Sequence, residues 1–532
     1  MFPTLIFDGE RIEPGTLAER AERAASGFAA LGVAEGDVIA VMLRNEPAYL
    51  EAMCAARALG AYLCPINWHF RADEAGYILR DSGAKALVID ATLVDQVREG
   101  IPASLAVIVA TPAEATRRAF ALPDVEPAGA GAAHAPGTRA AGGAGGAIAS
   151  AWPRYAPWRD AHPRYAGEPK RPRGMVPYTS GTTGRPKGVR RHPPPPERAA
   201  WQAEQAARLF RIVFALDAGS RALLAAPLYH SAPASYLNNA AQVACTLYLQ
   251  PRFDAEATLA LIARERITHA YLVPTMFQRL LRLAPEVRAR YDVSSIRHVA
   301  STGSPCPPEV RRAMIDWWGP VINECYASSE TGYATFIDSA EWLAHPGSVG
   351  RALADATVRV LDDDGAPLPP GEVGTIYVRQ PAYPDFSYIN NDAARARIER
   401  DGLVTVGDMG WLDADGYLYI TDRKSDMVIS GGVNIYPAEI EAALHAMPEV
   451  ADCAVFGIPH EEFGETLAAA VQLRPGCTAD ADAVRAFLRE RIAGYKVPRV
   501  VEFHASLPRE DTGKIFKRKL REPYWQGQAR KI

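Results

Sequence analysis

The sequence predicts an α/β protein with a large N-terminal domain of parallel-rich sheets, a β subdomain, and a small α+β C-terminal domain. Three observations support this prediction. Short apolar segments alternate with amphipathic segments along the first half of the chain, which is the order of strands and helices in parallel sheets. An alternating apolar and polar pattern follows over 357–379, and a compact α+β pattern begins near residue 425.

The first helix is expected over 16–32. Thr16 and Glu19 have the three-residue spacing of a capping box, and Gly32 stands where a helix commonly ends. The alternation of strands and helices then continues. The expected elements are a buried strand over 36–43, a helix over 46–59 followed by Gly60, and a strand over 84–90.

A flexible insertion is expected over about 126–165. Its central part, 128–150, consists almost entirely of Ala, Gly, Pro and Ser. Such a composition buries too little apolar area to offset the entropy lost on ordering. An Ala-rich helix is the alternative, and the seven glycines in this stretch argue against it.

Three later segments, 222–230, 268–277 and 296–303, are expected to be strands that run into loops. Because the carboxyl ends of parallel strands meet at one edge of a sheet, residues just after these strands are placed where ligands usually bind. A hairpin of 357–365 with 371–379 is expected in the β subdomain. The polar segment Asp422–Asp426 marks the domain boundary, giving domains 1–424 and 425–532.

The composition excludes several classes of protein. Lys and Arg number 58 against 62 Asp and Glu, so no basic excess suggests nucleic-acid binding. The seven cysteines are scattered without metal-like spacing, and they are expected to be reduced packing residues. The N-terminus does not have the pattern of a secretory signal, and no apolar run is long enough to span a membrane. A cytoplasmic location is therefore expected.

The most informative motif is YTSGTTGRPKGV, from Tyr178 to Val189. Its glycines allow backbone N–H groups to approach a ligand closely, its hydroxyls add donors, and Lys187 supplies a positive charge. This combination suits a polyphosphate. The Walker pattern does not fit, because Gly184 is followed by Arg-Pro-Lys-Gly.

The motif resembles the phosphate loop of the adenylate-forming superfamily, which includes acyl-CoA synthetases, firefly luciferase and the adenylation domains of peptide synthetases. Five further segments resemble that family's motifs in the family's order. They are PLYHSAP (227–233), STGSPCP (301–307), YASSETG (326–332), the segment 406–441 that contains VGDMG and SGGVNIYP, and PREDTGKIFKRKLRE (508–522).

The resemblance implies an acyl-CoA ligase that works in two steps. A carboxylate first reacts with ATP to give an acyl-adenylate and diphosphate, and CoA then displaces AMP. ATP, Mg²⁺ and CoA are the implied cofactor and co-substrates. The small C-terminal domain is implied to be mobile and to rotate between the two steps.

The resemblance also implies roles for individual residues. Lys514, His230 and Glu330 would be catalytic: Lys514 in adenylation, His230 at the acyl group, and Glu330 as the Mg²⁺ ligand. The remaining implied contacts are with nucleotide and CoA. They are Thr179, Ser180, Gly181, Thr182, Thr183, Gly184 and Lys187 for the β- and γ-phosphates; Thr302, Gly303, Ser304 and Tyr326 for adenine; Ser329 for a phosphate or the metal shell; Asp408 and Arg423 for ribose; and Gly431 and Gly432 for the pantetheine arm.

Each assignment has a plainer alternative. Glu330 could be a surface carboxylate, Arg423 an interdomain ion pair, and His230 a buried structural histidine. Lys514 could belong to a solvated basic tail. The chain also departs from the family pattern at Ser425, where the hinge residue is most often Asp or Lys, and the role of the Pro193–Pro196 run is left open.

Two other functions compete with CoA ligation. One is an adenylating ligase that loads a carrier protein, and the other is a non-catalytic nucleotide-binding relative. The small residues that follow His230 favour a medium- or long-chain fatty acid, or a bulky ring acid, over acetate. The oligomeric state is left open, with a homodimer as one alternative.

Overall fold

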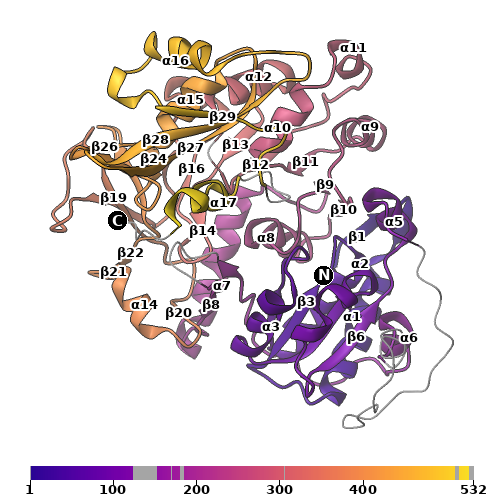
Figure 1. The fold of residues 1–532 in the computed structure, drawn as a ribbon. Helices are drawn as coiled ribbons and strands as arrows, with labels where there is room; N and C mark the ends of the chain where they lie inside the picture. The colour runs from indigo at the N-terminus through magenta and orange to yellow at the C-terminus, as the bar shows by residue number, and fades with distance from the viewer. Residues whose placement is uncertain are drawn as a thin grey trace. The chain divides into compact units, whose positions relative to one another are not determined.

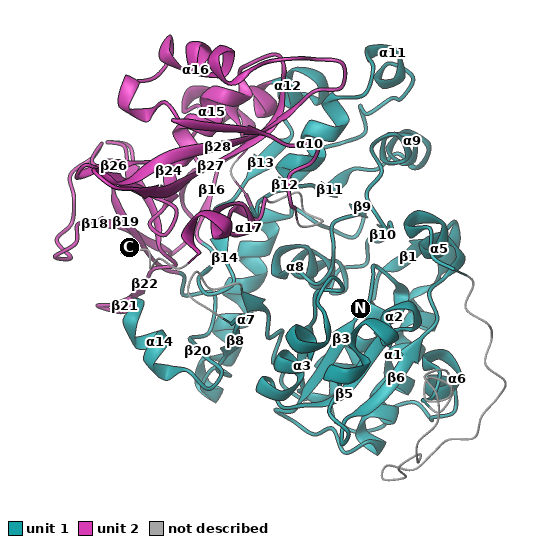
Figure 2. Cartoon of the chain, in the orientation of Figure 1, with its two compact units in different colours: residues 1–303, 313–333, 380–398 teal, residues 304–312, 334–379, 399–532 magenta. Residues whose placement is uncertain are grey.

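The computed structural model describes residues 2–123, 152–168, 170–179, 185–304, 306–509 and 515–526. Figure 1 shows the order of its helices and strands. The chain forms two compact units, which Figure 2 colours separately. The first unit contains residues 1–303, 313–333 and 380–398, and the second contains 304–312, 334–379 and 399–532. The boundary expected between 424 and 425 stays a prediction, since both of its sides lie in the second unit.

A four-stranded parallel sheet forms the N-terminal part of the first unit. Its strand order is β4-β3-β5-β6, with β3 (Val38–Met42), β4 (Tyr62–Pro65), β5 (Ala84–Asp90) and β6 (Ala106–Ala110). Every residue of β3 is buried, as expected of a strand covered on both faces. Helix α1 (Pro14–Ala30) precedes β3, α2 (Pro47–Leu59) connects β3 to β4, and α3 (Ala72–Asp81) connects β4 to β5.

Two of the predicted helix ends can be compared with the structure. The helix α2 ends at Gly60, which has φ +64°, a left-handed conformation that glycine adopts without strain. The start of α1 differs from the prediction: the helix begins at Pro14 with Glu13 as its N-cap. Proline favours the first helical turn, because it needs no partner for an N–H and its φ is already helical. Thr16 therefore lies inside the helix and does not cap it.

A seven-stranded sheet forms the rest of the framework of the first unit, in the order β13-β12-β11-β9-β10-β1-β2. All neighbouring strands are parallel except β1 and β2. The strands are β1 (Thr4–Phe7), β2 (Glu10–Ile12), β9 (Arg221–Leu224), β10 (Thr246–Leu249), β11 (His269–Tyr271), β12 (His298–Ser301) and β13 (Ile322–Glu324). Helices α8 (Ser231–Ala240), α9 (Ala255–Glu265) and α10 (Pro274–Leu281) connect them.

The end of the predicted insertion needs a correction. Residues 124–151, which include the Ala- and Gly-rich stretch, lie outside the described residues, but 152–168 are described and contain the helix α6 (Tyr155–Asp160). This helix is fixed by aromatic packing, since the ring centroids of Trp158 and Phe28 are 5.1 Å apart. The sequence suggested flexibility here because composition alone does not reveal this packing against α1.

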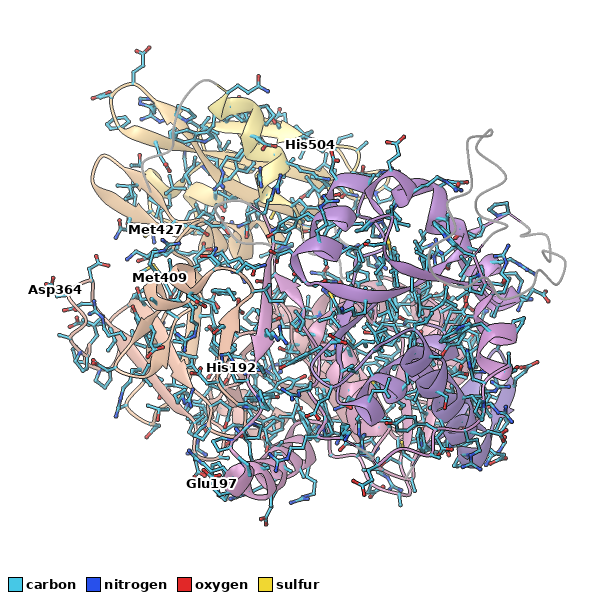
Figure 3. The ribbon with its side chains drawn as sticks, turned by 90° about the horizontal axis from the view of Figure 1, so that it is seen from below. His192, Glu197, Asp364, Met409, Met427 and His504 are labelled. Carbon is cyan, nitrogen blue, oxygen red and sulfur yellow. The ribbon has the colours of Figure 1, made fainter. Side chains whose placement is uncertain are left out.

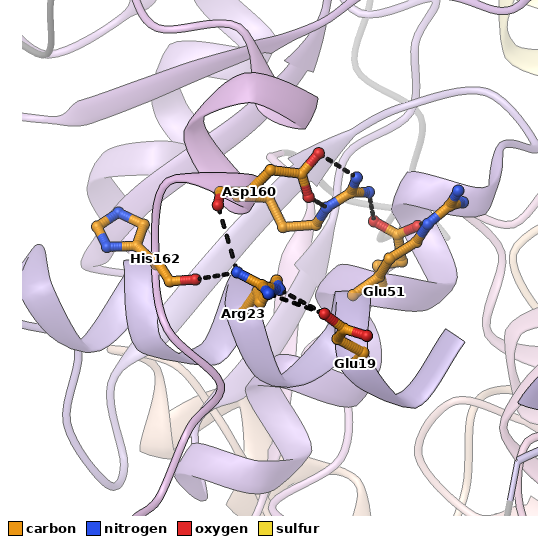
Figure 4. Close-up of polar contacts among 7 residues, drawn as sticks. Glu19, Arg23, Glu51, Asp160 and His162 are labelled. Atoms are coloured by element: carbon orange, nitrogen blue, oxygen red, sulfur yellow. Dashed lines mark hydrogen bonds and ion pairs between the residues drawn. The ribbon is translucent and has the colours of Figure 1, made fainter. Parts of the chain in front are cut away.

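Ion pairs complete the attachment of α6, as Figure 4 shows. Arg159 donates to the buried carboxylate of Glu51 at 2.8 Å. Arg23 donates to the carbonyl oxygen of His162 at 2.8 Å and to Glu19 at 2.9 Å. The segment that follows the insertion is thereby tied to both α1 and α2.

The described part of the second unit contains two larger sheets and a two-stranded one, β16 (Thr335–Phe336) with β17 (Arg351–Ala352). The first of the larger sheets has six strands, and its β18–β19 pair is the predicted hairpin, with Thr357 opposite Arg379. Its strands are β18 (Thr357–Leu361), β19 (Gly374–Arg379), β21 (Glu399–Arg400), β22 (Leu403–Val404), β23 (Asp408–Leu412) and β24 (Leu418–Arg423).

The other larger sheet of the second unit forms the core of the predicted C-terminal domain. It consists of β25 (Val428–Ser430), β26 (Val433–Ile435), β27 (Val450–His460), β28 (Gly464–Leu473) and β29 (Val500–Phe503). Apolar residues of this sheet pack with those of α15 (Pro437–His445) and α16 (Ala481–Arg489). The last described helix is α17 (Lys517–Arg521). Within the described residues, no helix is both long and apolar enough to cross a membrane.

The buried carboxyl group of Glu46 gives a test of this fold. It accepts hydrogen bonds from the Thr116 hydroxyl and, at 3.0 Å, from the Ala113 N–H. Burial outweighs these bonds and raises the pKa of Glu46 to about 7 from 4.5. Because the folded-state pKa is raised, the stabilising contribution is complete below pH 4.5 and is lost as the pH rises through 7.

We therefore expect the melting temperature to fall by several degrees more in the wild type than in Glu46→Gln between pH 5 and pH 8. The underlying change is on the order of 2 kcal/mol. Thermal unfolding at the two pH values measures it, with Glu114→Gln on the exposed side of α5 (Glu114–Phe120) as the matched control. Equal falls in the wild type and Glu46→Gln would contradict the assignment.

Candidate active site

The phosphate-loop motif forms a hairpin in the first unit. Strand β7 (Tyr178–Thr179) pairs antiparallel with β8 (Lys187–Arg191), so that Thr179 lies opposite Lys187. Gly188 is required by packing, because a Cβ atom there would come within 2.7 Å of the Tyr178 ring. Ser180, Gly181, Thr182, Thr183 and Gly184 lie outside the described residues.

The structure brings the hairpin to the predicted metal segment. The side chain of Glu330 is buried, and its Oε1 accepts hydrogen bonds from Thr179 Oγ1 at 3.3 Å and from the Tyr388 hydroxyl at 3.0 Å. Lys187 Nζ lies 5.0 Å from the centroid of the Tyr388 ring. Two predicted phosphate-binding residues and the predicted metal ligand are thus connected within one unit.

Tyr388 is a residue that the sequence analysis missed. It ends β20 (Phe386–Tyr388), the third strand of the sheet β20-β8-β7. Burial, and then the charge of Glu330, raise the pKa of the Tyr388 hydroxyl well above its usual range, so this group stays protonated and can donate a hydrogen bond to Glu330 at any working pH. Tyr388 lies in none of the motifs identified in the sequence, and its only sequence signal is an aromatic residue in a short strand.

Arg191 holds the backbone of the metal segment in place. Its Nη2 donates to the carbonyl oxygens of Ser329 at 2.8 Å and Glu330 at 3.0 Å, and its Nη1 donates to Pro384 at 2.9 Å. The guanidinium also lies over the Tyr383 ring, 4.7 Å from its centroid. A planar cation with several donors can satisfy such a group of carbonyls, whereas a lysine could not reproduce the arrangement.

The predicted acyl segment follows β9 and meets the metal segment. Ser231, the first residue of α8, places its Oγ 3.0 Å from Ser329 Oγ. His230 is the N-cap residue of that helix. Ser231 therefore links the segment of His230 to the segment of Glu330.

Two buried side chains fix the loop that precedes His230. Asn45 is fully buried; its Nδ2 donates to the carbonyls of Ala226 and Gln250, both at 3.0 Å, and its Oδ1 accepts from Leu228 N at 3.0 Å. Tyr49 donates its hydroxyl to the Leu228 carbonyl at 2.7 Å. Neither residue can be connected with the loop from the sequence alone, because both are separated from it by more than 170 positions.

The predicted adenine residues occupy the ends of neighbouring parallel strands. Thr302 and Gly303 follow β12, and Tyr326 follows β13. Gly303 has φ +99°, a conformation that favours glycine. These residues lie at the same sheet edge as the segment after β9, as the parallel order predicts. Ser304, the next residue, belongs to the second unit.

In the second unit, the structure pairs the two predicted ribose residues. Asp408 and Arg423 are opposite each other on β23 and β24, and Arg423 Nε lies 3.1 Å from Asp408 Oδ1. Asp408 is buried, whereas the Arg423 side chain is 43% exposed. The ion pair is therefore within one compact unit, and the arginine could orient a carboxylate that accepts hydrogen bonds from hydroxyl groups.

The predicted pantetheine glycines form the turn between β25 and β26. Gly431 has φ +58° and Gly432 has φ +83°, so both need the left-handed conformation. Gly431 N donates to the Phe463 carbonyl at 2.9 Å. Lys514 lies outside the described residues.

Lys517 lies within the predicted catalytic segment 508–522, and its side chain is only 19% exposed. Lys517 Nζ lies 2.7 Å from Glu441 Oε1. Burial alone would lower the pKa of Lys517, but the carboxylates of Glu441, Asp422 and Asp426 outweigh it and raise that pKa. The ion pair fixes the start of α17 to α15, so Lys517 has a structural role.

The chain is similar to known proteins over most of its length. Residues 2–383 match the family model described as AMP-binding enzyme, and 439–514 match the AMP-binding enzyme C-terminal domain. An indoleacetate–CoA ligase of Aromatoleum aromaticum is 34% identical, over 95% of this chain and 92% of its own. The long-chain-fatty-acid–CoA ligase FadD13 of Mycobacterium tuberculosis is 32% identical, over 95% and 91%. The crystal structure of ATP-bound MatB from Rhodopseudomonas palustris is similar with a TM-score of 0.78 and 26% identity, covering 98% of this chain and 95% of that one.

The buried amide of Asn45 provides a test of the loop geometry. Asn45→Ala would leave three buried backbone groups without their partner, at a cost on the order of 2–4 kcal/mol. We expect a melting temperature several degrees below that of the wild type, and a much smaller decrease for Tyr49→Phe, which removes one bond and keeps the ring. Differential scanning calorimetry of both variants checks this, and equal decreases would contradict a dominant role for Asn45.

Proposed function

Because the chain belongs to the family of AMP-binding enzymes, we propose that it activates a large carboxylic acid, either a medium- or long-chain fatty acid or a bulky ring acid, and transfers the acyl group to CoA. The wider activity is that of an AMP-forming acid–thiol ligase, as in the related CoA ligases. The named substrates of these relatives, indoleacetate and long-chain fatty acids, support a large acyl group over acetate. The cytoplasmic location stays a prediction, and so does the homodimer.

The observation that carries the proposal is the connected group of Thr179, Lys187 and Glu330 beside the segment of His230. An ammonium, a hydroxyl and a carboxylate at the edge of a parallel sheet suit a nucleotide polyphosphate. Such a site favours phosphoryl or adenylyl transfer, in which catalysis depends on position and electrostatics.

The oxygen atoms of Glu330 and Ser329 also suit a magnesium ion as ligands. Mg²⁺ prefers hard oxygen ligands and is commonly held by one or two carboxylates together with substrate phosphates and water. Glu330 would supply the carboxylate, with the hydroxyl of Ser329 nearby. Bound there, the ion would neutralise charge on the phosphates of ATP.

In the first step, a carboxylate oxygen of the substrate attacks the α-phosphorus of ATP, and the bond to diphosphate breaks. Lys187 and the hydroxyls of the phosphate loop would hold the leaving diphosphate. Lys514 would stabilise the charge that develops at the α-phosphate. His230 would close the acyl site and align the carboxylate for attack.

In the second step, the CoA thiolate attacks the acyl carbon and AMP leaves. Asp408, oriented by Arg423, would accept hydrogen bonds from the ribose hydroxyls of the adenylate. The Gly431–Gly432 turn would leave room for the pantetheine arm to pass close to the backbone. No cysteine of the protein is needed as a nucleophile, since CoA brings its own thiol.

A panel of carboxylates tests the reaction and its substrate class. With ATP, Mg²⁺ and CoA, we expect AMP, diphosphate and an acyl-CoA thioester in equal amounts, and faster turnover of octanoate, palmitate or indoleacetate than of acetate. Diphosphate release and thioester formation are measured together. ADP with orthophosphate would overturn adenylation, and a thioester formed only on an added carrier protein would favour the carrier-loading alternative.

Two variants separate the half-reactions. Lys514→Ala should lose on the order of 10²-fold or more in acyl-adenylate formation, which is the scale for removal of one electrostatic stabiliser. The same variant should convert synthetic acyl-adenylate and CoA to thioester at a near-normal rate. Gly432→Leu should do the reverse. Single-turnover measurements of each step check this, and equal damage to both steps in both variants would contradict the separate assignment.

A further inference from the structure

Tyr388 connects two segments that are far apart in the sequence. Its strand β20 pairs antiparallel with β8, the second strand of the phosphate-loop hairpin, and Tyr388 lies opposite Val189. The side chain is 4% exposed. The phenol is therefore held at a fixed distance from the hairpin by backbone pairing and by burial.

The hydroxyl of Tyr388 determines which oxygen of Glu330 is engaged. It donates to Oε1 at 3.0 Å, and Thr179 donates to the same oxygen at 3.3 Å. In the part of the chain that the structure describes, neither bond uses Oε2. A carboxylate held through one oxygen presents the other in a defined direction, which a cation with strict coordination geometry requires.

The ring of Tyr388 makes a second and separate contact. Its centroid lies 5.0 Å from Lys187 Nζ. A cation over an aromatic face is stabilised without using its N–H groups on a protein acceptor. Lys187 can therefore be held near the phosphate loop with its donors still available to a phosphate.

We propose that Tyr388 is a positioning residue for ATP binding: its hydroxyl orients Glu330 toward the cation of MgATP, and its ring holds Lys187 for the phosphates. This inference rests on the proposed function. In this role Tyr388 acts through Glu330 and Lys187, and not by a direct contact with the reacting groups.

The two contacts can be separated by substitution. Tyr388→Phe removes the hydroxyl and keeps the ring, so we expect the affinity for ATP without Mg²⁺ to stay within about 2-fold of wild type. The affinity for MgATP should fall by about 5- to 10-fold, as expected for loss of a hydrogen bond to a charged group. Tyr388→Leu removes both contacts and should also weaken the binding of ATP without Mg²⁺.

Isothermal titration of the full chain with ATP, with and without Mg²⁺, measures these affinities without turnover. The Mg²⁺ concentration that gives half-maximal diphosphate release should rise in parallel for Tyr388→Phe. Ser387→Ala is the matched control on the same strand. Its hydroxyl lies 3.0 Å from Nε2 of His192, which Figure 3 labels, and this contact is exposed, so the control should bind as the wild type does.

Two results would overturn the inference. One is MgATP binding by Tyr388→Phe equal to that of the wild type. The other is an equal loss of affinity with and without Mg²⁺ in the Phe variant, which indicates a general structural role. The Phe variant alone decides the point if the Leu variant does not fold. If the wild type binds MgATP but the Phe variant gives one of these results, the inference about Tyr388 fails while the proposed nucleotide binding stands. If the wild type itself does not bind MgATP, the proposed function fails.

Discussion

The hydrogen bonding of the Glu330 carboxylate is the constraint on which the arrangement of the first unit's site depends. A charge that is removed from water must be compensated by nearby donors, or its burial becomes costly. Thr179 and Tyr388 supply two donors from different strands, and Arg191 fixes the backbone on either side of the Glu330 peptide. If the strand of Thr179 or of Tyr388 moved away, the buried carboxylate of Glu330 would lose a hydrogen-bond donor. The need to keep these hydrogen bonds therefore fixes the positions of the hairpin, β20 and the metal segment relative to one another.

A similar rule explains how the acyl segment is held. A loop that is covered by other parts of the protein must pair its backbone groups with side chains, because strand or helix partners are absent there. Asn45 and Tyr49 do this for the loop before His230, and both come from the start of α2 or just before it. The four-stranded sheet thus contributes to the site although none of its strands carries a predicted catalytic residue.

In the second unit, ion pairs and backbone conformation hold the predicted site residues in place. Arg423 orients Asp408 across two paired strands, and Lys517 joins α17 to α15 through Glu441. Gly431 and Gly432 have positive φ angles, and few residue types other than glycine adopt this conformation without strain. The features that the sequence singled out in this unit therefore have local structural explanations as well as the proposed functional ones.

The sequence by itself determined the fold class, several individual helices and strands, and the family, because these depend on local patterns: the period of apolar residues and the spacing within motifs. Strand 84–90 and the helix ending at Gly60 are examples, and so is the hairpin after residue 357. It also identified Thr179, Lys187 and Glu330 as candidates. Only the tertiary structure decided what holds these residues and the loop before His230. Tyr388, Arg191 and Asn45 act across 58 to 205 residues of chain and belong to none of the motifs identified in the sequence. The packing of α6 on α1 was missed for the same reason: the interaction of Trp158 with Phe28 is a property of two surfaces, and neither segment alone reveals it.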